Sequence, residues 1–307
     1  MKKCVLIINP NSGKDLSEDY ILDYQEILKK HDYETVIYFT ARSKHATEII
    51  RYLDSNVDLV VSVGGDGTFN EVVTGNLKRK EPLLLAHIPL GTTNDIGAMF
   101  GYGSDVLENF KLALEGTVKK IDICTINKRP FVYVAGFGKF MNVPYETPRN
   151  LKSRYGHFAY IIEGLKSFVN PTELYDLTYK IGDKVYSGQY SFMLISNANR
   201  IAGINNFYKD VKLDDDQFEV ILCNLTKKAD IVKSLYMIAT SNITEAKGFE
   251  FYRLNELEIK FNEVPENAWC IDGERLDDET TTYKIEIVKD FSILMPRKNI
   301  KKLFITK

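Results

Sequence analysis

The sequence predicts an α/β N-terminal domain with a doubly wound parallel sheet, followed by a mostly antiparallel β-sandwich C-terminal domain. Apolar strands alternate with helical segments through the first 120 or so residues, whereas short strands follow one another after Asp122. The chain has 307 residues, 44% of them hydrophobic, which is enough for two cores. We therefore expect an α/β domain at 1–123, a β-rich domain at 124–295 and a tail at about 296–307 that packs back on the first domain.

The elements of the first domain follow from their periodicity. Continuous apolar runs rich in Val, Ile and Leu are typical of parallel strands that are buried on both faces. Such runs lie at 4–9, 35–40, 57–63 and 83–88. Segments with helical spacing lie between and after them, near 18–30, 43–53, 67–76 and 104–115.

The second domain is expected to consist mainly of strands, because its apolar segments are short and closely spaced. These segments lie at 131–137, 174–181, 190–196, 218–223, 249–254, 256–261, 282–288 and 291–296. Two helical stretches interrupt them, at 155–168 and 228–239.

Composition excludes several function classes. The net charge of -2 carries no electrostatic footprint for nucleic acid. No run approaches the roughly 20 apolar residues of a membrane-spanning helix, and the apolar start of the chain stops at Asn9. The four cysteines form no CxxC pair, so we expect buried, reduced thiols and a cytoplasmic protein.

The stretch VSVGGDGTFNEV (62–73) predicts a phosphate-binding turn. Its valines end a strand, Phe69 begins the apolar face of a helix, and glycines occupy the turn between them. Glycine lets a ligand approach the backbone closely, and the first turn of a helix offers N–H groups and a partial positive charge. An anion is the natural occupant of such a turn.

Neither of the two common phosphate-loop patterns fits this chain. NPNSGK (9–14) lacks the first glycine of a P-loop, where Ile8 stands, and a dinucleotide fingerprint needs glycine at Asn70. NPNSG, GGDGT and PLGTTND (89–95) instead follow three strands of one predicted parallel sheet. Because ligands bind at the carboxyl ends of such strands, the three turns are expected to line one crevice.

In this order, NPNSG, GGDGTFNE and PLGTTND resemble the catalytic domain of diacylglycerol kinases and of the related sphingosine and ceramide kinases. The chain is most similar to the soluble bacterial lipid kinases, because RNLKSRYGHFAYIIEGLKSF (149–168), LDDDQFEV (213–220) and IDGE (271–274) also resemble segments of that family. GGDGT alone is less specific, since NAD kinases and 6-phosphofructokinases carry a similar loop. The resemblance implies a fold of the NAD kinase and diacylglycerol kinase type and an ATP-dependent lipid kinase that uses magnesium.

The resemblance also implies which residues bind the nucleotide. They are Asn9, Pro10, Asn11, Ser12, Gly13, Thr40, Gly64, Gly65, Asp66, Gly67, Thr68, Asn70, Glu71, Thr93 and Asn94. Among them, Asp66 is expected to act in catalysis by holding the Mg²⁺ that accompanies ATP, directly or through water. A hard cation prefers carboxylate oxygen, so the residue type suits this role.

IDGE is predicted to carry the acid–base step. If 271–274 are extended, Asp272 and Glu274 lie on one face of the strand, with Gly273 between them. The resemblance assigns to Glu274 the general base that takes the proton of the acceptor hydroxyl. Asp272 is expected to support the metal or its water.

LDDDQF is predicted to hold a structural Mg²⁺. The resemblance implies the Asp215 carboxylate and the main-chain carbonyls of Lys212 and Gln217 as ligands. The family has glycine after this aspartate, but this chain has Asp216, and in IAGINNF (201–207) only Gly203 remains of a glycine run. Both departures count against the metal site, because Asp tolerates left-handed backbone less well than glycine.

Plainer interpretations stand beside these. GGDGT suits a strand–helix turn without a ligand, and IDGE and LDDDQF suit solvated turns. The basic segment 149–168 suits either contact with an anionic membrane or an ordinary amphipathic helix. The four histidines have no metal-site spacing, and Trp269 is expected to serve packing.

The function implied by the resemblance is transfer of the γ-phosphate of ATP to diacylglycerol, giving phosphatidic acid. Another hydroxyl lipid, such as a sphingoid base or monoacylglycerol, is the enzymatic alternative, and a nucleotide-binding regulator without catalysis is the other. The expected partners are the lipid substrate and, transiently, the inner face of the membrane, with no nucleic acid. A homodimer is one option.

Overall fold

The structure is a computed structural model whose chain divides into two compact units: Met1–Ile121 with Lys289–Lys307, and Asp122–Val288. It describes residues 1–13, 18–138, 174–201, 204–205, 208, 210–227, 230, 247–276, 278–298 and 300–305. The helices predicted at 155–168 and 228–239, and with them the basic segment 149–168 and Gly203, lie outside the described residues.

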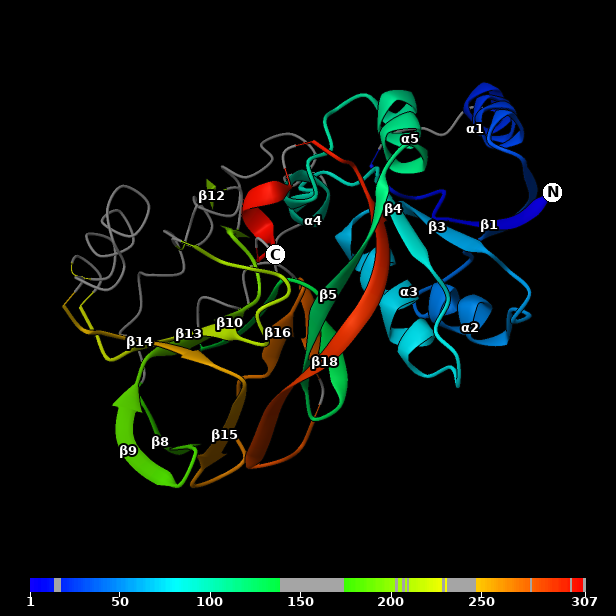
Figure 1. Cartoon of the computed structure of the whole chain (residues 1–307). Coiled ribbons are helices and arrows are strands. Elements are labelled where there is room, and N and C mark those ends of the chain that lie inside the picture. Colours follow the sequence, from blue (N-terminus) through cyan, green and yellow to red (C-terminus); the bar gives the residue numbers. More distant parts are fainter. Residues whose placement is uncertain are drawn as a thin grey trace. The chain divides into compact units, whose positions relative to one another are not determined.

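The first unit contains the predicted parallel sheet, with strand order β2-β1-β3-β4 (Figure 1). Its strands are β1 (Lys2–Ile8), β2 (Tyr33–Phe39), β3 (Leu59–Gly64) and β4 (Leu85–Pro89). The central strands are almost wholly buried, as expected for a sheet covered on both faces, whereas side chains of the edge strand β2 are exposed or half-buried. Beyond β4, Ile293 of a C-terminal strand pairs in parallel with Leu85.

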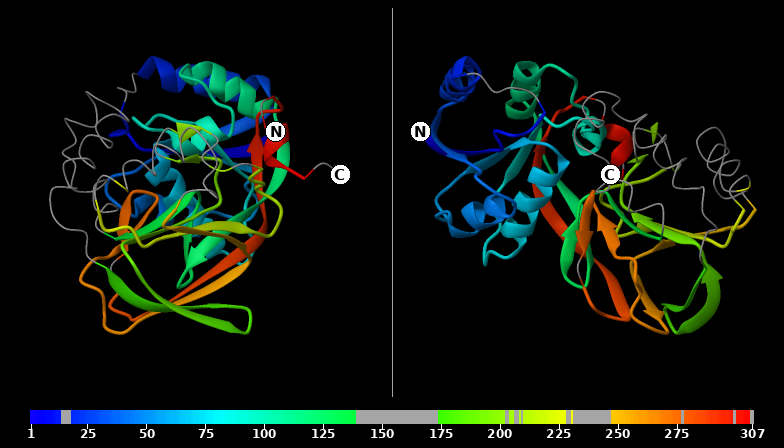
Figure 2. Two further views of the ribbon diagram at one scale, coloured as in Figure 1. Left: turned by 90° about the vertical axis from the view of Figure 1, so that its left-hand side faces the viewer. Right: turned by 180° about the vertical axis from the view of Figure 1, so that it is seen from behind.

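Helices cover both faces of this sheet, which confirms the doubly wound architecture. They are α1 (Glu18–Lys30), α2 (His45–Tyr52), α3 (Asp66–Leu77), α4 (Asp95–Met99) and α5 (Val106–Leu114). Figures 1 and 2 show α1 and α5 on one face of the sheet and α2 and α3 on the other. Tyr24 stacks on Phe110 between α1 and α5, with ring centroids 4.8 Å apart. The short helix α4 is absent from the sequence-based prediction.

The second unit consists of antiparallel strands, as predicted, and shares two of them, β5 and β18, with the first unit. One sheet has the order β14-β13-β10-β7-β16-β17, and β18-β15-β8-β9 form another set, with β5 and β6 paired beside β18. The strands are β5 (Thr117–Ile126), β6 (Arg129–Phe131), β7 (Val134–Gly138), β8 (Tyr175–Ile181), β9 (Lys184–Tyr190), β10 (Phe192–Ser196), β11 (Arg200–Ile201), β12 (Ile204–Asn205), β13 (Phe218–Cys223), β14 (Phe249–Leu254), β15 (Glu256–Phe261), β16 (Trp269–Ile271), β17 (Glu274–Leu276) and β18 (Thr282–Met295).

Two strand predictions in this unit are wrong in detail. The expected strand 131–137 is divided, because β6 ends at Phe131 and β7 begins at Val134. The segments 282–288 and 291–296 were expected as two strands, because Lys289 and Asp290 interrupt the apolar pattern. The structure has the single strand β18, in which Asp290 takes a positive φ of 61°. The strand runs through Lys289 and Asp290, so two polar residues do not end it.

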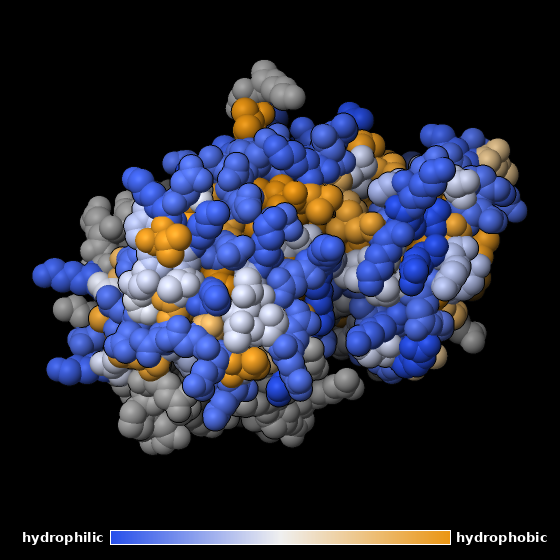
Figure 3. Space-filling view, turned by 90° about the horizontal axis from the view of Figure 1, so that it is seen from below, coloured by the Kyte–Doolittle hydropathy of each residue, from blue (hydrophilic) through white to orange (hydrophobic). Residues whose placement is uncertain are grey.

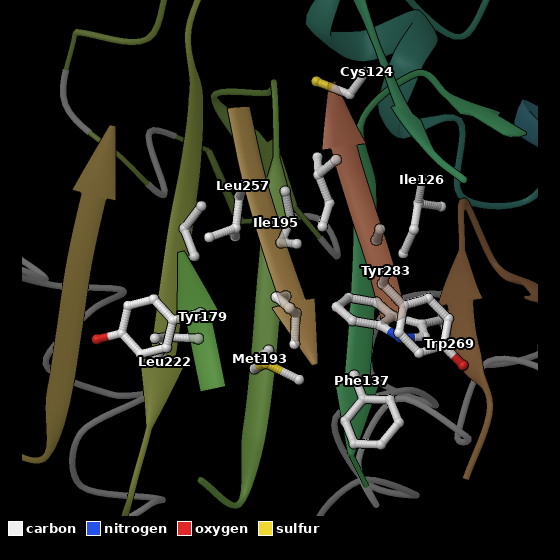
Figure 4. Packing of buried hydrophobic residues seen from close by; sticks show 14 of the residues in the cluster. Cys124, Ile126, Phe137, Tyr179, Met193, Ile195, Leu222, Leu257, Trp269 and Tyr283 are labelled. Carbon is white, nitrogen blue, oxygen red and sulfur yellow. The ribbon is translucent and has the colours of Figure 1, made fainter. Parts of the chain in front are cut away.

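Aromatic side chains dominate the core of the second unit. Trp269 is fully buried, and its ring centroid lies 5.4 Å from that of Phe137 and 5.5 Å from that of Tyr283 (Figure 4). This confirms that Trp269 serves packing. All four cysteines are buried and unbridged, as predicted.

The surface of the described residues is mixed. On the face drawn in Figure 3, hydrophilic residues predominate and apolar residues show in separate patches. Within the described part of the chain, no helix has the length and apolar character needed to cross a membrane.

Candidate functional site

Three turns of the first unit meet at the carboxyl ends of β1, β3 and β4. The Asn9 side chain donates to Thr68 Oγ1 at 3.0 Å, and the Gly65 N–H donates to Ser12 Oγ at 3.3 Å. The Leu90 N–H donates to the Gly64 carbonyl at 2.7 Å. The structure therefore brings NPNSG, GGDGT and PLGTTND together, as the parallel-sheet argument predicts.

The turns approach so closely that two of their glycines, Gly13 and Gly91, cannot carry side chains. A Cβ at Gly91 would lie 2.8 Å from Gly65 Cα, and a Cβ at Gly13 would lie 2.7 Å from the Leu90 carbonyl oxygen. Gly13 also has a left-handed φ of 55°. Sequence reasoning identified Gly13 and Gly65 but not Gly91, although PLGTTND includes it.

Helix α3 begins at the centre of this cluster. Its N-cap residue is Gly65, in extended conformation, so no N-cap side chain covers the first turn. The helix has 12 residues, and Thr68 and Asn70 of its first turns are buried. Together with the convergence of the turns, this geometry suits a phosphate group.

The Asp66 carboxylate holds the loop after β4. Its two oxygens accept the N–H groups of Asp95 at 2.9 Å and Ile96 at 3.2 Å, at the start of α4. Asn94, which precedes α4 in left-handed conformation, donates from its side chain to the Gly91 carbonyl. A carboxylate has about four acceptor positions, so two such bonds are compatible with a second role in metal binding.

The remaining nucleotide-binding candidates of this unit lie in three places. Pro10, Asn11, Gly64, Gly67 and Thr93 lie in or beside the three turns. Thr40 is buried at the end of β2, and its N–H donates to the Ile8 carbonyl at 2.8 Å. Glu71 points elsewhere, because its carboxylate accepts N–H groups at the start of α2.

Residues 271–274 are not extended throughout, so the condition for Asp272 and Glu274 to share a strand face is not met. These residues form a two-residue hairpin turn between β16 and β17, with Ile271 paired to Glu274. Asp272 and Gly273 have positive φ values of 47° and 89°, as in a type I′ turn, for which Asp-Gly is a preferred sequence. The side chains of Asp272 and Glu274 therefore do not share a face through strand alternation.

Asp272 is buried and bonded to the backbone. Its carboxylate accepts the N–H groups of Val132, Tyr133 and Val134 at 2.6, 3.1 and 3.0 Å. The carboxylate thus fastens the hairpin to the residues before β7. Glu274, in contrast, is exposed at the start of β17.

The acidic turn 212–217 contains a left-handed residue, the backbone conformation that glycine adopts most easily. Asp216 adopts the left-handed φ of 59°, so its replacement of the family's glycine is accommodated. Its N–H donates to the Asp122 carboxylate at 2.8 Å, and the Gln217 N–H donates to Asp215 Oδ1 at 3.2 Å. Burial raises the pKa of the Asp215 carboxyl.

Two buried acids beside this turn were missed by sequence reasoning. Asp122 is 4% exposed and Glu219 is 2% exposed. Burial raises the pKa of Glu219 to about 8, although Arg253, 3.4 Å away, counteracts the shift. Glu219 belongs to the segment LDDDQFEV, but Phe218 and Val220 flank it directly and the resemblance assigns it no role.

The donor chemistry of this turn fits a hard cation. Asp215 has a carboxylate, and the main-chain carbonyls of Lys212 and Gln217 belong to the same turn; these are the oxygen types that a bound Mg²⁺ would need. Among the residues that the structure describes, no group of three or more His, Cys, Asp or Glu is placed to hold a metal. A cation here would therefore depend on main-chain oxygen and water.

Comparison with known proteins identifies similar sequences. The family of the diacylglycerol kinase catalytic domain matches residues 3–126. A diacylglycerol kinase of Staphylococcus epidermidis is 36% identical over 231 residues, which cover 75% of this chain and 73% of that protein. A diacylglycerol kinase of Staphylococcus saprophyticus is 31% identical over 275 residues and 89% of each chain.

Solved structures share the fold. Two structures from Bacillus anthracis strain Sterne, both described with the name diacylglycerol kinase, are 23% and 22% identical to this chain. Each superposition covers 96% of this chain and 97% of the solved chain, with TM-scores of 0.80 and 0.75. At this level of identity the likeness concerns the fold.

Proposed function

Because the chain belongs to the diacylglycerol kinase family, and is therefore a lipid kinase with an alcohol group as acceptor, we propose that it phosphorylates diacylglycerol. The γ-phosphate of ATP is transferred to the free hydroxyl of the lipid, giving phosphatidic acid and ADP. The observation that carries the nucleotide half of this proposal is the meeting of the three glycine turns at the start of α3.

ATP is bound by the first unit in this proposal. The N–H groups at the start of α3 bind the phosphates, and the short side chains of Ser12 and Thr68 limit the space around them. The bonds from Asp66 to the start of α4 keep the loop after β4 in place before the nucleotide arrives. Preorganised donors of this kind act without rearranging during the reaction.

Magnesium enters the proposal in two places. Asp66 is the residue assigned to the ion that accompanies ATP, and Asp215, with the carbonyls of Lys212 and Gln217, is assigned to a structural ion. When bound, the ATP-associated ion neutralises charge on the phosphate oxygens. Asp272 is assigned to positioning the Glu274 hairpin, because its carboxylate already accepts three N–H groups.

Glu274 is proposed as the general base. Its exposed carboxylate accepts the proton of the lipid hydroxyl, whose oxygen forms a bond to the γ-phosphorus. The bond from the γ-phosphorus to the bridging oxygen breaks, and ADP leaves with its electron pair. Since the substrate resides in a bilayer, the proposal includes transient contact with a membrane.

The proposal is tested by the transfer of labelled γ-phosphate from ATP, with Mg²⁺, to lipids in mixed micelles. The panel contains diacylglycerol, monoacylglycerol and a sphingoid base, with NAD as a control acceptor. Labelled phosphatidic acid is expected. A product from another lipid only would overturn the substrate assignment, and ATP binding without any lipid product would favour a regulator.

Glu274→Gln tests the mechanism. The loss of a general base typically lowers the rate by about 10²- to 10⁴-fold, so kcat is expected to fall by this amount. ATP affinity is expected to stay within about twofold, because a general base acts on the lipid hydroxyl in the transition state and does not hold the nucleotide. An unchanged kcat would contradict the assignment of the base.

A further inference from the structure

The N-terminus of α2 lacks a cap from its own chain segment. Its N-cap residue is Lys44, which has no acceptor in its side chain and takes a left-handed φ of 65°. Helix N-termini leave N–H groups that need an acceptor, which Ser, Thr, Asp or Asn usually supplies. A lysine in left-handed conformation at this position is unfavourable on both counts.

The acceptor comes from α3, on the same face of the sheet. Glu71 Oε1 accepts the Lys44 N–H at 2.7 Å, and Oε2 accepts the Ala46 N–H at 3.1 Å. Thr47 Oγ1 donates to the Glu71 main-chain carbonyl at 2.8 Å, which adds a third bond between the helices. A negative charge at a helix N-terminus is also favoured by the helix dipole.

These bonds join two loops of the candidate nucleotide site. Glu71 lies in the second turn of α3, whose N-cap Gly65 belongs to the GGDGT turn. Lys44 ends the loop that starts at Thr40, at the carboxyl end of β2. The other side of this loop is held by His45, whose Nδ1 accepts the Ala41 N–H at 3.0 Å.

We propose that Glu71 is a positioning residue, which holds the loop 40–44 against α3 so that Thr40 is in place before ATP binds. Glu71 thus acts on the nucleotide through α2 and not by contact with the phosphates. This inference rests on the proposed kinase function. It assigns the glutamate of GGDGTFNE to the preorganisation of the nucleotide site.

The first test compares Glu71→Ala and Glu71→Gln. Glu71→Ala removes both bonds from a charged acceptor, and KM for ATP is expected to rise by roughly 10- to 100-fold. Gln keeps one acceptor oxygen, so Glu71→Gln is expected to raise KM by roughly 3- to 10-fold. In both variants kcat at saturating ATP is expected to stay within about twofold, because a positioning role affects binding of ground and transition states alike.

A matched control is Glu48→Gln. Glu48 is an exposed carboxylate of α2 that pairs with Arg42 at 2.7 Å, and it accepts no N–H group at the helix start in any bond of the described residues. Exposed ion pairs contribute little, so its KM is expected to match that of the unchanged enzyme. Equal effects of Glu48→Gln and Glu71→Gln would overturn the inference.

A second measurement does not depend on catalysis. Hydrogen exchange of the Lys44 and Ala46 amides, measured without ATP, is expected to speed up at least about tenfold in Glu71→Ala and to stay unchanged in Glu48→Gln. Unchanged exchange would overturn the inference even if the enzyme phosphorylates diacylglycerol. Faster exchange together with a failure of all lipid acceptors would support the loop contact and overturn only the proposed function. A fall in kcat at unchanged KM would show direct action in the transition state and overturn the positioning role.

Discussion

The contacts of Asp272 predict that its removal destabilises the second unit. Its carboxylate accepts three N–H groups, from Val132, Tyr133 and Val134, and it lies 5% exposed in a left-handed conformation. Asp272→Gly removes the carboxylate and keeps the backbone free to adopt the turn. Asp272→Ala removes the carboxylate and adds left-handed strain. Asp272→Asn keeps one acceptor oxygen and a residue type that suits the turn.

The magnitudes follow from the three bonds. A hydrogen bond to a charged group contributes about 1.5–3 kcal/mol, and partial replacement by water makes the sum less than additive. We expect the unfolding free energy to fall by about 3–5 kcal/mol in Asp272→Gly. Asp272→Ala is expected to lose about 1 kcal/mol more, because alanine resists a φ of this sign. The expected loss in Asp272→Asn is about 1–2 kcal/mol.

The assay is urea unfolding followed by tryptophan fluorescence. The chain has one tryptophan, Trp269, which is fully buried three residues before Asp272, so its emission reports on the second unit. Asp183→Asn is the control, because Asp183 is an exposed acid in the turn between β8 and β9. Its unfolding free energy is expected to change by less than about 0.5 kcal/mol.

One result would refute this reasoning. If Asp272→Gly changes the unfolding free energy by no more than the Asp183→Asn control, the three bonds do not hold the hairpin. A second result would change the role of Asp272. If Asp272→Asn kept the full unfolding free energy but lost all kinase activity, Asp272 would act on the metal or the reacting groups, as the resemblance first implied. Partial loss of both activity and stability is the expected outcome, because the hairpin carries Glu274.

Two further predictions concern the first unit. Gly91→Ala is expected to lower the unfolding free energy by about 1–3 kcal/mol and to weaken ATP binding, since its Cβ would lie 2.8 Å from Gly65 Cα. Gly103→Ala is the control, because a Cβ added at Gly103 would have no neighbouring atom within 4 Å. Calorimetric titration measures the ATP affinity of both variants, and equal affinities would contradict the close approach of the turns. Burial lowers the pKa of His87 from 6.5 to about 3. Below pH 6.5 the unfolded chain therefore binds a proton at His87 that the folded chain does not bind, and the unfolding free energy falls as the pH falls. Between pH 7 and 5 the unfolding free energy is expected to fall by about 2 kcal/mol through His87 alone. His87→Leu is expected to remove this contribution in urea unfolding. If the unfolding free energies of His87→Leu and of the unchanged protein fell in parallel with pH, the prediction would be contradicted.

Much of the fold was predictable from local pattern. The strands β1, β3 and β4 are runs of apolar residues with few competing interpretations, and the helices α1 and α3 have clear boundaries. The strand β9 was missed because most of its residues are exposed and its sequence, KVYSGQY, shows no regular alternation. Its place is decided by pairing with β8, which the segment itself does not encode.

The candidate site was predictable in part for the same reason. Each glycine turn follows its own strand, so the rule for parallel sheets brings the turns together without further information. The partners of acidic residues were not predictable in this way. Asp66 bonds residues 29 and 30 positions away, and Asp272 bonds residues 138 to 140 positions away.

By itself, the sequence determined the class of the fold, the order of the three glycine turns and the Asp-Gly turn at 272–273 as a plain alternative. Periodicity and φ preference are local properties, so they can be derived from a short segment. Only the tertiary structure decided what the carboxylates bind: Asp272 the backbone before β7, Glu71 the start of α2, and Asp66 the start of α4. A carboxylate binds whichever donors the fold brings within about 3 Å, and residues distant in sequence determine those donors.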